Sequence, residues 1–376
     1  MLKVKITAGQ HKRIACPVIV PLDIDYKGPV KLKGKNVEFN GEAKTAGGKS
    51  ALIFMIDTLA AGSEEIFDVE KTAENREKIT FKEIGSEKLE IYKGKHLLTN
   101  YWCDNKFSKP FIHPIPFFGL SSVTRNFPMV NVPGESTDHK HHRSIWTAWG
   151  DVNGIDCWSE EEGHGFIIQK YFTLFSEGYT SANFRMLNHW TDRNRKKLLE
   201  ENRSVTIYNA GEDFCLIDFE SKYFASESDV VFGDTKEGGL LCVRMATPLE
   251  GDKGGRIANA YGALGEEECW GKKAPWCDYS GTMENKKVGI TLFDSPNNPG
   301  YPVHWHARNY GLFAANPFGV SGFTGNRQLN GSYTLKKGNE MIFEHRMLIH
   351  KGWLEESVPE IHFNNYINPP KVTILL

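Results

Sequence analysis

Short stretches in which polar and apolar residues alternate run through this chain, and this alternation constrains its fold more than any other feature. Clear examples are residues 30–33, 88–92, 204–208 and 340–347. Turn-forming pairs such as Asn40-Gly41 and Gly338-Asn339 separate these stretches. Because successive side chains of a strand point to opposite faces, the pattern predicts antiparallel sheets with one buried and one wet face. We therefore expect a mainly β protein.

The length of 376 residues suits about two domains. Residues 1–76 are interpreted as a small N-terminal β-unit, of which the polar stretch 57–76 is a connector. Residues 77–354 continue the strand pattern without a change in composition, which predicts one large antiparallel β-sandwich. Residues 355–376 contain three prolines and are expected to pack along the surface as a C-terminal tail that ends in a short strand.

Charge and composition exclude several classes of protein. The chain has 45 Lys and Arg against 47 Asp and Glu, a net charge of −2, so nothing points to nucleic acid or to an anionic membrane as a partner. No apolar run approaches the roughly 18 residues of a membrane span, and the N-terminus lacks a signal-peptide pattern. The seven cysteines are scattered without a CxxC pair, which is typical of a reduced, cytoplasmic protein. A homo-oligomer remains compatible with the sequence.

The densest group of polar residues is the segment Asp138-His139-Lys140-His141-His142-Arg143, followed by Trp146 and Trp149. In an extended segment His139, His141 and Arg143 would share one face. Two such histidines could bind a divalent metal with a third ligand from elsewhere. They could equally act as acid and base near neutral pH, with Arg143 binding a substrate oxygen. The residues alone leave both readings open.

Three further segments carry candidate residues. The segment 301–311 contains His304, His306, Arg308 and Tyr310, and its first three would share a face in a strand. The segment 233–239 is a glycine-containing turn, in which Lys236 and Glu237 could supply a charge clamp and a base; Arg244 follows it. The segment 270–281 offers Trp276, Asp278 and Tyr279, which suit a stacking wall and an acceptor for sugar hydroxyls. The nucleotide-binding fingerprints GxGxxG and GxxxxGK[ST] are absent, which disfavours nucleotide-dependent chemistry on the familiar folds.

Together these segments resemble the PmoA-like family, which carries the label "methane oxygenase PmoA". The matching stretches are KPFIHPIPFFGLSSVTRNFP (109–128), DHKHHRSIWTAWGDVNGIDCW (138–158), GDTKEGGLLCVRMA (233–246), WGKKAPWCDYSG (270–281) and NPGYPVHWHARNYGLFAANPFG (298–319). Methane oxidation is not carried over, because a methane monooxygenase subunit spans the membrane and this chain has no candidate span. The resemblance implies a role in carbohydrate catabolism, and the β pattern is similar to the galactose-mutarotase type of supersandwich.

On this basis we expect a carbohydrate-active enzyme that uses acid/base chemistry on a sugar, keto-sugar or glycoside, by epimerisation, elimination or hydrolysis. The expected acid/base residues are His139, His141, Glu237 and His306. The three histidines are also the candidate ligands if a divalent metal ion is bound; no other cofactor is expected. The expected substrate-binding residues are His142, Arg143, Trp146, Trp149, Lys236, Arg244, Trp276, Asp278, Tyr279, Arg308 and Tyr310.

Two alternatives remain. A non-catalytic carbohydrate-binding sandwich would use the same aromatic walls without a titrating pair. A metal-dependent oxidoreductase would hold iron or copper through its histidines. All three hypotheses assume that the four segments converge in space.

Overall fold

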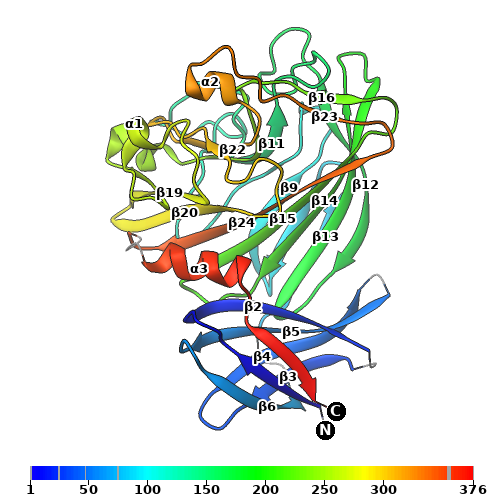
Figure 1. Ribbon diagram of the computed structural model, residues 1–376, viewed down its shortest axis with the longest axis vertical. Helices are drawn as coiled ribbons and strands as arrows, with labels where there is room; N and C mark the ends of the chain where they lie inside the picture. The colour runs from blue at the N-terminus through cyan, green and yellow to red at the C-terminus, as the bar shows by residue number, and fades with distance from the viewer. Residues whose placement is uncertain (1, 24–25, 47, 74–75, 354–356, 376) are drawn as a thin grey trace.

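The computed structural model describes residues 2–23, 26–46, 48–73, 76–353 and 357–375. In these residues the chain forms three large antiparallel sheets and a few short helices (Figure 1). The expected mainly β architecture, a small β-unit followed by a large antiparallel sandwich, is confirmed. The predicted boundary at 354–355 lies outside the described residues.

Sheet 1 is seven-stranded and forms the smaller body at the base of Figure 1. In spatial order its strands are β2 (Arg13–Leu22), β5 (Lys49–Leu59), β4 (Glu38–Ala46), β3 (Gly28–Lys33), β6 (Glu64–Lys71), β1 (Lys3–Thr7) and β25 (Lys371–Leu375). Both ends of the described chain thus meet in this sheet, because β25 pairs with β1. The sheet has its own apolar core, to which Ile6, Leu32 and Phe54 contribute.

The stretch 57–76, interpreted above as a connector, contains the internal strand β6. Asp68 and Glu70 are compatible with a strand because they lie on its wet face, while Phe67 and Val69 on the other face are buried. The wet face then forms ion pairs across strands, such as Asp68 with Lys3 at 3.0 Å and Glu70 with Lys33 at 2.7 Å. The polar composition of this stretch therefore marks a paired strand surface.

Sheets 2 and 3 have eight strands each and form the larger body. Sheet 2 consists, in spatial order, of β21 (His304–Trp305), β22 (Leu312–Asn316), β17 (Gly238–Arg244), β11 (Ile145–Trp149), β10 (Phe111–Ile112), β9 (His96–Trp102), β8 (Lys88–Lys93) and β7 (Ile79–Ile84). Sheet 3 consists of β12 (Phe166–Ser176), β13 (Ser181–Thr191), β14 (Lys197–Tyr208), β15 (Phe214–Phe224), β24 (Glu340–Lys351), β20 (Lys286–Asp294), β19 (Trp276–Met283) and β18 (Arg256–Asn259).

The two eight-stranded sheets pack face to face around a shared apolar core. Ile91 and Val243 of sheet 2 and Phe184 and Ile290 of sheet 3 belong to this core. Since successive side chains alternate, every second residue of each strand enters the core and its neighbours face outward. The outward faces of sheets 2 and 3 therefore lie on opposite sides of the sandwich, so polar residues on these two faces cannot form one site.

The remaining elements are short. A two-stranded ribbon pairs β16 (Val230–Phe232) with β23 (Tyr333–Leu335). The helices are α1 (Gly265–Cys269), α2 (Val320–Thr324) and α3 (Ser357–Ile367), and two 3-10 turns are formed by Thr247–Leu249 and Gly251–Lys253. Helix α3 lies at the junction of the two bodies and contacts β2 (Figure 1). Among the described residues, no helix is both long enough and apolar enough to cross a bilayer.

A buried carboxylate joins sheet 1 to the sandwich. Glu42, only 4% exposed, accepts hydrogen bonds from the backbone N–H groups of Tyr179 (2.9 Å), Thr180 (3.0 Å) and Ser181 (3.1 Å). A Cβ atom at Gly178 would collide with this carboxylate, so the close approach requires glycine there. This contact attaches sheet 1 to the turn between β12 and β13 of sheet 3.

We expect Glu42→Ala to lower the free energy of unfolding by about 3 kcal/mol, because three buried N–H donors would lose a charged acceptor. Urea unfolding followed by circular dichroism measures this difference. Glu64→Ala is the control, since Glu64 is half exposed in an ion pair with Lys5, and it should leave the transition nearly unchanged. Equal effects of both substitutions would contradict the assigned role of Glu42.

Candidate active site

The candidate site lies on the outward face of sheet 2. Strands β11, β17 and β22 direct Ile145, Val243 and Phe313 into the sandwich core. Their neighbours Trp146 and Leu312 lie in a separate cluster on the other face. The segments 126–143 and 306–311 fold back over this second face and carry most of the polar residues of the site. Three of the four segments expected from the sequence, those around 138–143, 233–244 and 304–310, come together here.

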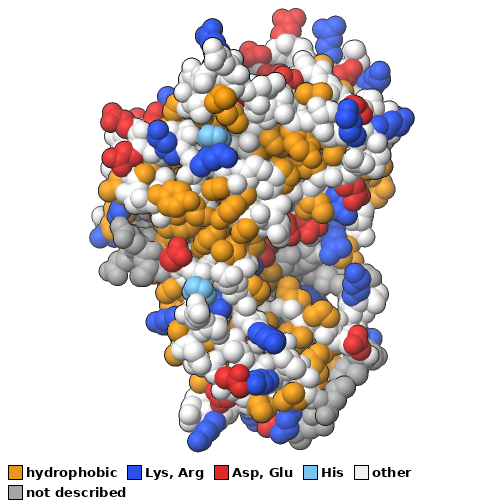
Figure 2. Space-filling model, in the orientation of Figure 1, with side chains coloured by type: hydrophobic (Ala, Val, Ile, Leu, Met, Phe, Trp, Pro, Cys, Tyr) orange, Lys and Arg blue, Asp and Glu red, His pale blue; other side chains and the backbone are white. Residues whose placement is uncertain are grey.

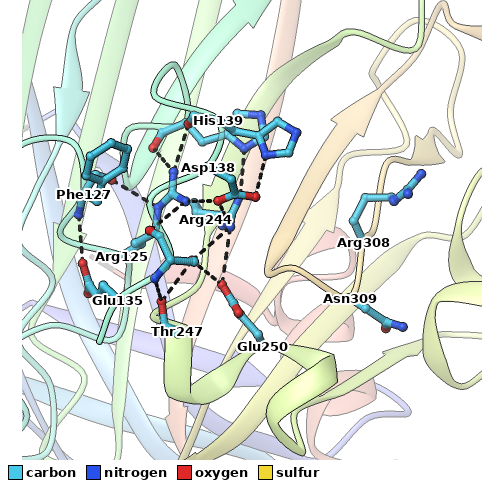
Figure 3. A network of polar contacts seen from close by, with 12 residues as sticks. Arg125, Phe127, Glu135, Asp138, His139, Arg244, Thr247, Glu250, Arg308 and Asn309 are labelled. Atoms are coloured by element: carbon cyan, nitrogen blue, oxygen red, sulfur yellow. Dashed lines mark hydrogen bonds and ion pairs between the residues drawn. The ribbon is translucent and has the colours of Figure 1, made fainter. Parts of the chain in front are cut away.

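Two buried arginines organise the site (Figure 3). Arg125 and Arg244 are both 0% exposed, and both bind the same oxygen of Asp138, at 2.5 Å and 2.7 Å. Arg125 also donates to the backbone carbonyls of Phe127 and His139, at 3.2 Å and 3.0 Å. Burial and the neighbouring Arg244 lower the pKa of Arg125 to about 10, so the guanidinium remains charged at neutral pH.

A second carboxylate completes the surroundings of Arg244. Glu250 lies 3.4 Å from the Arg244 guanidinium and accepts a 2.7 Å hydrogen bond from Ser136. Burial raises the pKa of Asp138, but Arg244, the hydrogen bond to His139 and Arg125 outweigh burial and lower it below the usual value. Asp138 is therefore ionised at neutral pH and can only accept hydrogen bonds.

Asp138 in turn orients His139. Its second oxygen lies 2.6 Å from Nδ1 of His139, so Nδ1 carries the proton and Nε2 has the lone pair. The side chain of His139 is 39% exposed, and no described residue makes a hydrogen bond to Nε2. His139 also has a φ angle of +43°, a conformation that side chains other than glycine rarely adopt and that is often retained at functional sites. This carboxylate–imidazole pair presents one reactive nitrogen to solvent.

Aromatic rings form the wall beside this pair. The ring of His139 stacks on Tyr310 (centroids 4.7 Å apart) and on His142 (4.8 Å). His142 stacks in turn on Trp146 at 5.1 Å, and Nη1 of Arg244 lies 3.2 Å from its Nδ1. The four rings make a continuous stack from the solvent to the sheet, and His139 is the exposed imidazole in it.

The deeper histidines are held neutral. Burial, with Lys109 and His139 nearby, lowers the pKa of His141 to about 4. Burial also lowers the pKa of His142 well below its ordinary value. For His306, burial lowers the pKa to about 4, although the carboxylate of Glu237 acts in the opposite direction. These imidazoles are uncharged at neutral pH and serve as polar ring surfaces rather than cations.

Glu237 lies in the turn that precedes β17. Its carboxylate is half exposed and pairs with Lys236 at 3.0 Å. Its charge opposes the lowering of the pKa of His141 and His306 and contributes to the raised pKa of Tyr310. The turn that carries it is held by Asn316, whose amide donates to the carbonyls of residues 235, 236 and 238. Glu237 is therefore close enough to His141, His306 and Tyr310 to influence their pKa values.

The segment 138–143 is a turn rather than the extended segment considered above. The N–H of His142 donates to the carbonyl of His139 at 2.9 Å, which places residues three apart over one another and accounts for the stacking of these two rings. Arg143 leaves the cluster and binds Glu160 through two hydrogen bonds of 3.0 and 2.7 Å. The metal-binding face that an extended segment would have formed is thus not present.

The segment 304–310 behaves as expected from the sequence. His304 pairs with Asn316, and the ladder continues through His306 and Arg308, so all three belong to one face. Nδ1 of His304 donates to the carbonyl of Gly271 (2.8 Å), and its ring stacks on Phe323. Arg308 is a third exposed and pairs through Nε with Glu266 at 2.9 Å; Figure 3 shows its guanidinium apart from the buried arginines.

Besides Arg143, four expected substrate-binding residues lie outside this site. Trp149 is buried between Phe232 and Phe318. Tyr279 is buried in the sandwich core, and its hydroxyl binds the carbonyls of Arg308 and Asn309. These positions correct the expectation that both rings form stacking walls. Trp149 faces away from Trp146 because residues three apart in a strand point to opposite sides.

Trp276 and Asp278 are also displaced from the expected position. Both lie on β19 in sheet 3, on the face turned away from the core. The fourth segment therefore does not converge with the other three. Tyr279 is in the sandwich core and does not line the site. It supports the site only through its hydroxyl, which holds the backbone at Arg308 and Asn309.

Several residues of the site were not singled out from the sequence. Arg125, Asp138 and Glu250 form the charged network, and Lys109 with Glu160 holds Arg143. Asp138 belongs to the histidine-rich segment but was not assigned a role there, and the others lie in ordinary polar contexts along the chain. No local pattern distinguishes a buried guanidinium from a solvated one, so only the packing of distant segments identifies them. Among the described residues, no group of three or more His, Cys, Asp or Glu side chains is arranged to hold a metal ion.

Comparison with known proteins places this architecture in a family. A model of the DUF6807 family, described as a family of unknown function, matches residues 88–363. The chain belongs to the DUF6807 family. The matched range of this DUF6807 protein includes all three segments of the candidate site. No finding supports the resemblance to the PmoA-like family, and the comparison with curated proteins found no match.

Two solved structures from Enterococcus faecalis align with this DUF6807 protein. A protein in glycosyl hydrolase family 38 has a TM-score of 0.46 and 9% identity, with coverage of 100% of this chain and 47% of that chain. An α-mannosidase has a TM-score of 0.43 and 9% identity, with coverage of 100% and 46%. The chain therefore spans about half the length of these structures.

The pair of Arg143 and Glu160 leads to a prediction about pH. Burial raises the pKa of Glu160, but Lys109 and Arg143 outweigh burial and lower it to about 2. A carboxylate whose pKa is lowered in the folded state stabilises the fold above its unfolded pKa, and this stabilisation is lost as the pH falls from about 4.5 towards 2. The shift corresponds to about 3 kcal/mol at neutral pH.

Accordingly, Glu160→Gln should destabilise the protein strongly at pH 7 and progressively less as the pH falls towards 3. Urea unfolding of both proteins across this pH range gives the difference. Glu161→Gln serves as the control, because Glu161 is exposed and forms no ion pair with the described residues. A difference between wild type and Glu160→Gln that stays constant with pH would contradict the ion-pair origin of the effect.

Proposed function

We propose that this protein is a carbohydrate-active enzyme that transfers protons at a sugar or keto-sugar, with His139 as its acid/base residue. The observation that carries the proposal is the Asp138–His139 pair, in which the carboxylate holds Nδ1 at 2.6 Å and leaves Nε2 directed away from it. A fixed tautomer with one accessible nitrogen is the arrangement that general acid/base catalysis requires.

The neighbouring groups fit proton transfer at a ring oxygen or at a carbon beside a carbonyl. Nε2 of His139 would accept a proton from the substrate, and its imidazolium would be stabilised by the ionised Asp138. Glu237 would serve as the second acid/base group, because its carboxylate is half exposed and the pKa of Tyr310 responds to both Asp138 and Glu237. Two acid/base groups suit epimerisation, in which one group removes a proton from the sugar and the other delivers one.

Arg308 would neutralise charge that develops on a substrate oxygen. It is a third exposed, and its pairing with Glu266 uses Nε, so its two terminal nitrogens would be the groups that meet a substrate oxygen. Arg125 and Arg244 have a different role, because both are fully buried and bind Asp138. They would keep Asp138 ionised throughout the reaction rather than contact the substrate. A preorganised charge of this kind needs no rearrangement during the reaction.

The stack of Tyr310, His139, His142 and Trp146 also suits a protein that only binds sugars, which is the second candidate function. Polar aromatic rings at a site entrance present apolar faces and hydrogen-bonding edges to a sugar ring. The divalent metal ion and the metal-dependent oxidoreductase considered from the sequence stay predictions, and nothing in the site geometry supports them further.

The decisive measurement is proton NMR in heavy water with aldoses, uronates, glycosides and 3-keto-glycosides. We expect the wild-type protein to accelerate anomer exchange, deuterium incorporation beside a carbonyl or loss of the aglycone for at least one substrate. His139→Ala should reduce that rate by about 10²- to 10⁴-fold, and Asp138→Asn and Glu237→Gln should also reduce it. Melting temperatures establish that each variant is folded.

His164→Ala is a matched control, because His164 lies outside the site and binds the carbonyl of Gly165. It should leave the rate unchanged. Full activity of a folded His139→Ala variant would eliminate His139 as the acid/base residue. Selective line broadening of a sugar without any chemical change would establish the binding protein in place of the enzyme.

A further inference from the structure

The outward face of sheet 3 contains a cavity of about 230 Å³ between β18, β19 and the beginning of α3. Its walls include Arg256, Ala258, Trp276, Asp278, Ser280 and Glu360. The His139 site lies on the outward face of sheet 2, on the other side of the sandwich core. In Figure 2 apolar side chains gather on the face of the larger body above α3, in the region of β19 and β20. The cavity is thus separate from the site described above.

The pairing of β18 with β19 explains why a cavity forms here. Ala258 lies directly opposite Asp278, and the N–H of Ala260 binds the carbonyl of Trp276. Two alanines therefore face the two largest outward residues of β19, where larger side chains would fill the space. The intervening Cys277 and Tyr279 point into the sandwich core. The register thus gathers the polar groups of β19 beside an unfilled volume.

A buried carboxylate lies at the base of the cavity. Asp278 is 3% exposed and accepts hydrogen bonds from Ser280 (2.7 Å), Thr291 (2.9 Å) and His350 (3.0 Å). The ring of His350 reaches it over Gly289, where a Cβ atom would stand 2.5 Å from the imidazole. A carboxylate has about four acceptor positions, so Asp278 retains one for a further donor.

Two donors at the cavity have no partner in the described part of the chain. Nε1 of Trp276 makes no hydrogen bond there, although the residue is only 6% exposed. Arg256 forms no ion pair or side-chain hydrogen bond with any described residue. Glu360, the other charged group of the lining, is held by Asn364 at 2.9 Å. Buried donors are normally satisfied, so the indole N–H of Trp276 points to a ligand that supplies an oxygen atom. Arg256 is partly exposed and leaves its guanidinium available to the same ligand.

We propose that this cavity binds a small polyhydroxylated acid, of the chemical class of the hexuronic acids. The ligand carboxylate would pair with the guanidinium of Arg256, which matches carboxylates through two parallel hydrogen bonds. The indole N–H of Trp276 would donate to one of the ligand's oxygens. A ligand hydroxyl would donate to the remaining acceptor position of Asp278. The cavity volume suits a single sugar ring rather than a chain.

Isothermal titration with D-galacturonate and with D-galactose tests this proposal. Wild-type protein should bind galacturonate saturably and at least tenfold more tightly than galactose. Arg256→Met should weaken galacturonate binding at least tenfold, and Ala258→Leu, which fills the cavity, should abolish it. Arg327→Met removes an exposed arginine elsewhere and should leave the affinity unchanged. Melting temperatures again identify any variant that fails to fold.

The same titration separates this cavity from the His139 site. Galacturonate binding should persist in His139→Ala and be lost in Ala258→Leu, whatever the fate of the proposed enzymatic activity. The reverse pattern would place the ligand in the other site and overturn the proposal. Absence of saturable galacturonate binding, or equal binding of galactose, would overturn it as well.

Discussion

Two positive charges buried in the same place determine how this protein builds its site. Arg125 and Arg244 are both removed from water, and a buried guanidinium is costly unless anions and carbonyl oxygens surround it. Asp138 satisfies both at once, and Glu250 adds a second carboxylate beside Arg244. The segment 126–143 must therefore fold back over sheet 2, since only then do its carboxylate and carbonyls reach the two arginines. The position of His139 is a consequence of this requirement.

The histidines of the site divide into two kinds because they differ in burial. His141, His142 and His306 are kept neutral by their surroundings and pack as rings. His139 alone combines exposure with a carboxylate on Nδ1. A chain rich in histidine at one place can thus supply a single reactive imidazole and several structural ones. Sheet 3 contains a second carboxylate–imidazole pair, Asp278 with His350, which is buried.

Much of the architecture could be predicted from alternation, and its exceptions have physical reasons. The polar residues of β6 suggested a connector, because composition does not reveal that charged side chains pair across neighbouring strands. Helix α3 was not expected either, and it packs by contacts with β2, far away in the sequence. Trp149 and Tyr279 were expected beside Trp146 and Trp276, but each lies three positions from its companion. Strict alternation already separates residues at that spacing, so the sequence held that information.

The sequence by itself determined that this chain forms antiparallel sheets, and it located three of the segments that meet at the candidate site. Alternation and clusters of histidine involve residues that are neighbours in the sequence, so both can be recognised from the sequence alone. Only the tertiary structure decided which face each cluster occupies, which arginines lose their water and which imidazole keeps an accessible nitrogen. These properties depend on contacts between residues such as Asp138 and Arg244, 106 positions apart. Burial and pairing arise only when distant segments pack together, and for that reason no local pattern encodes them.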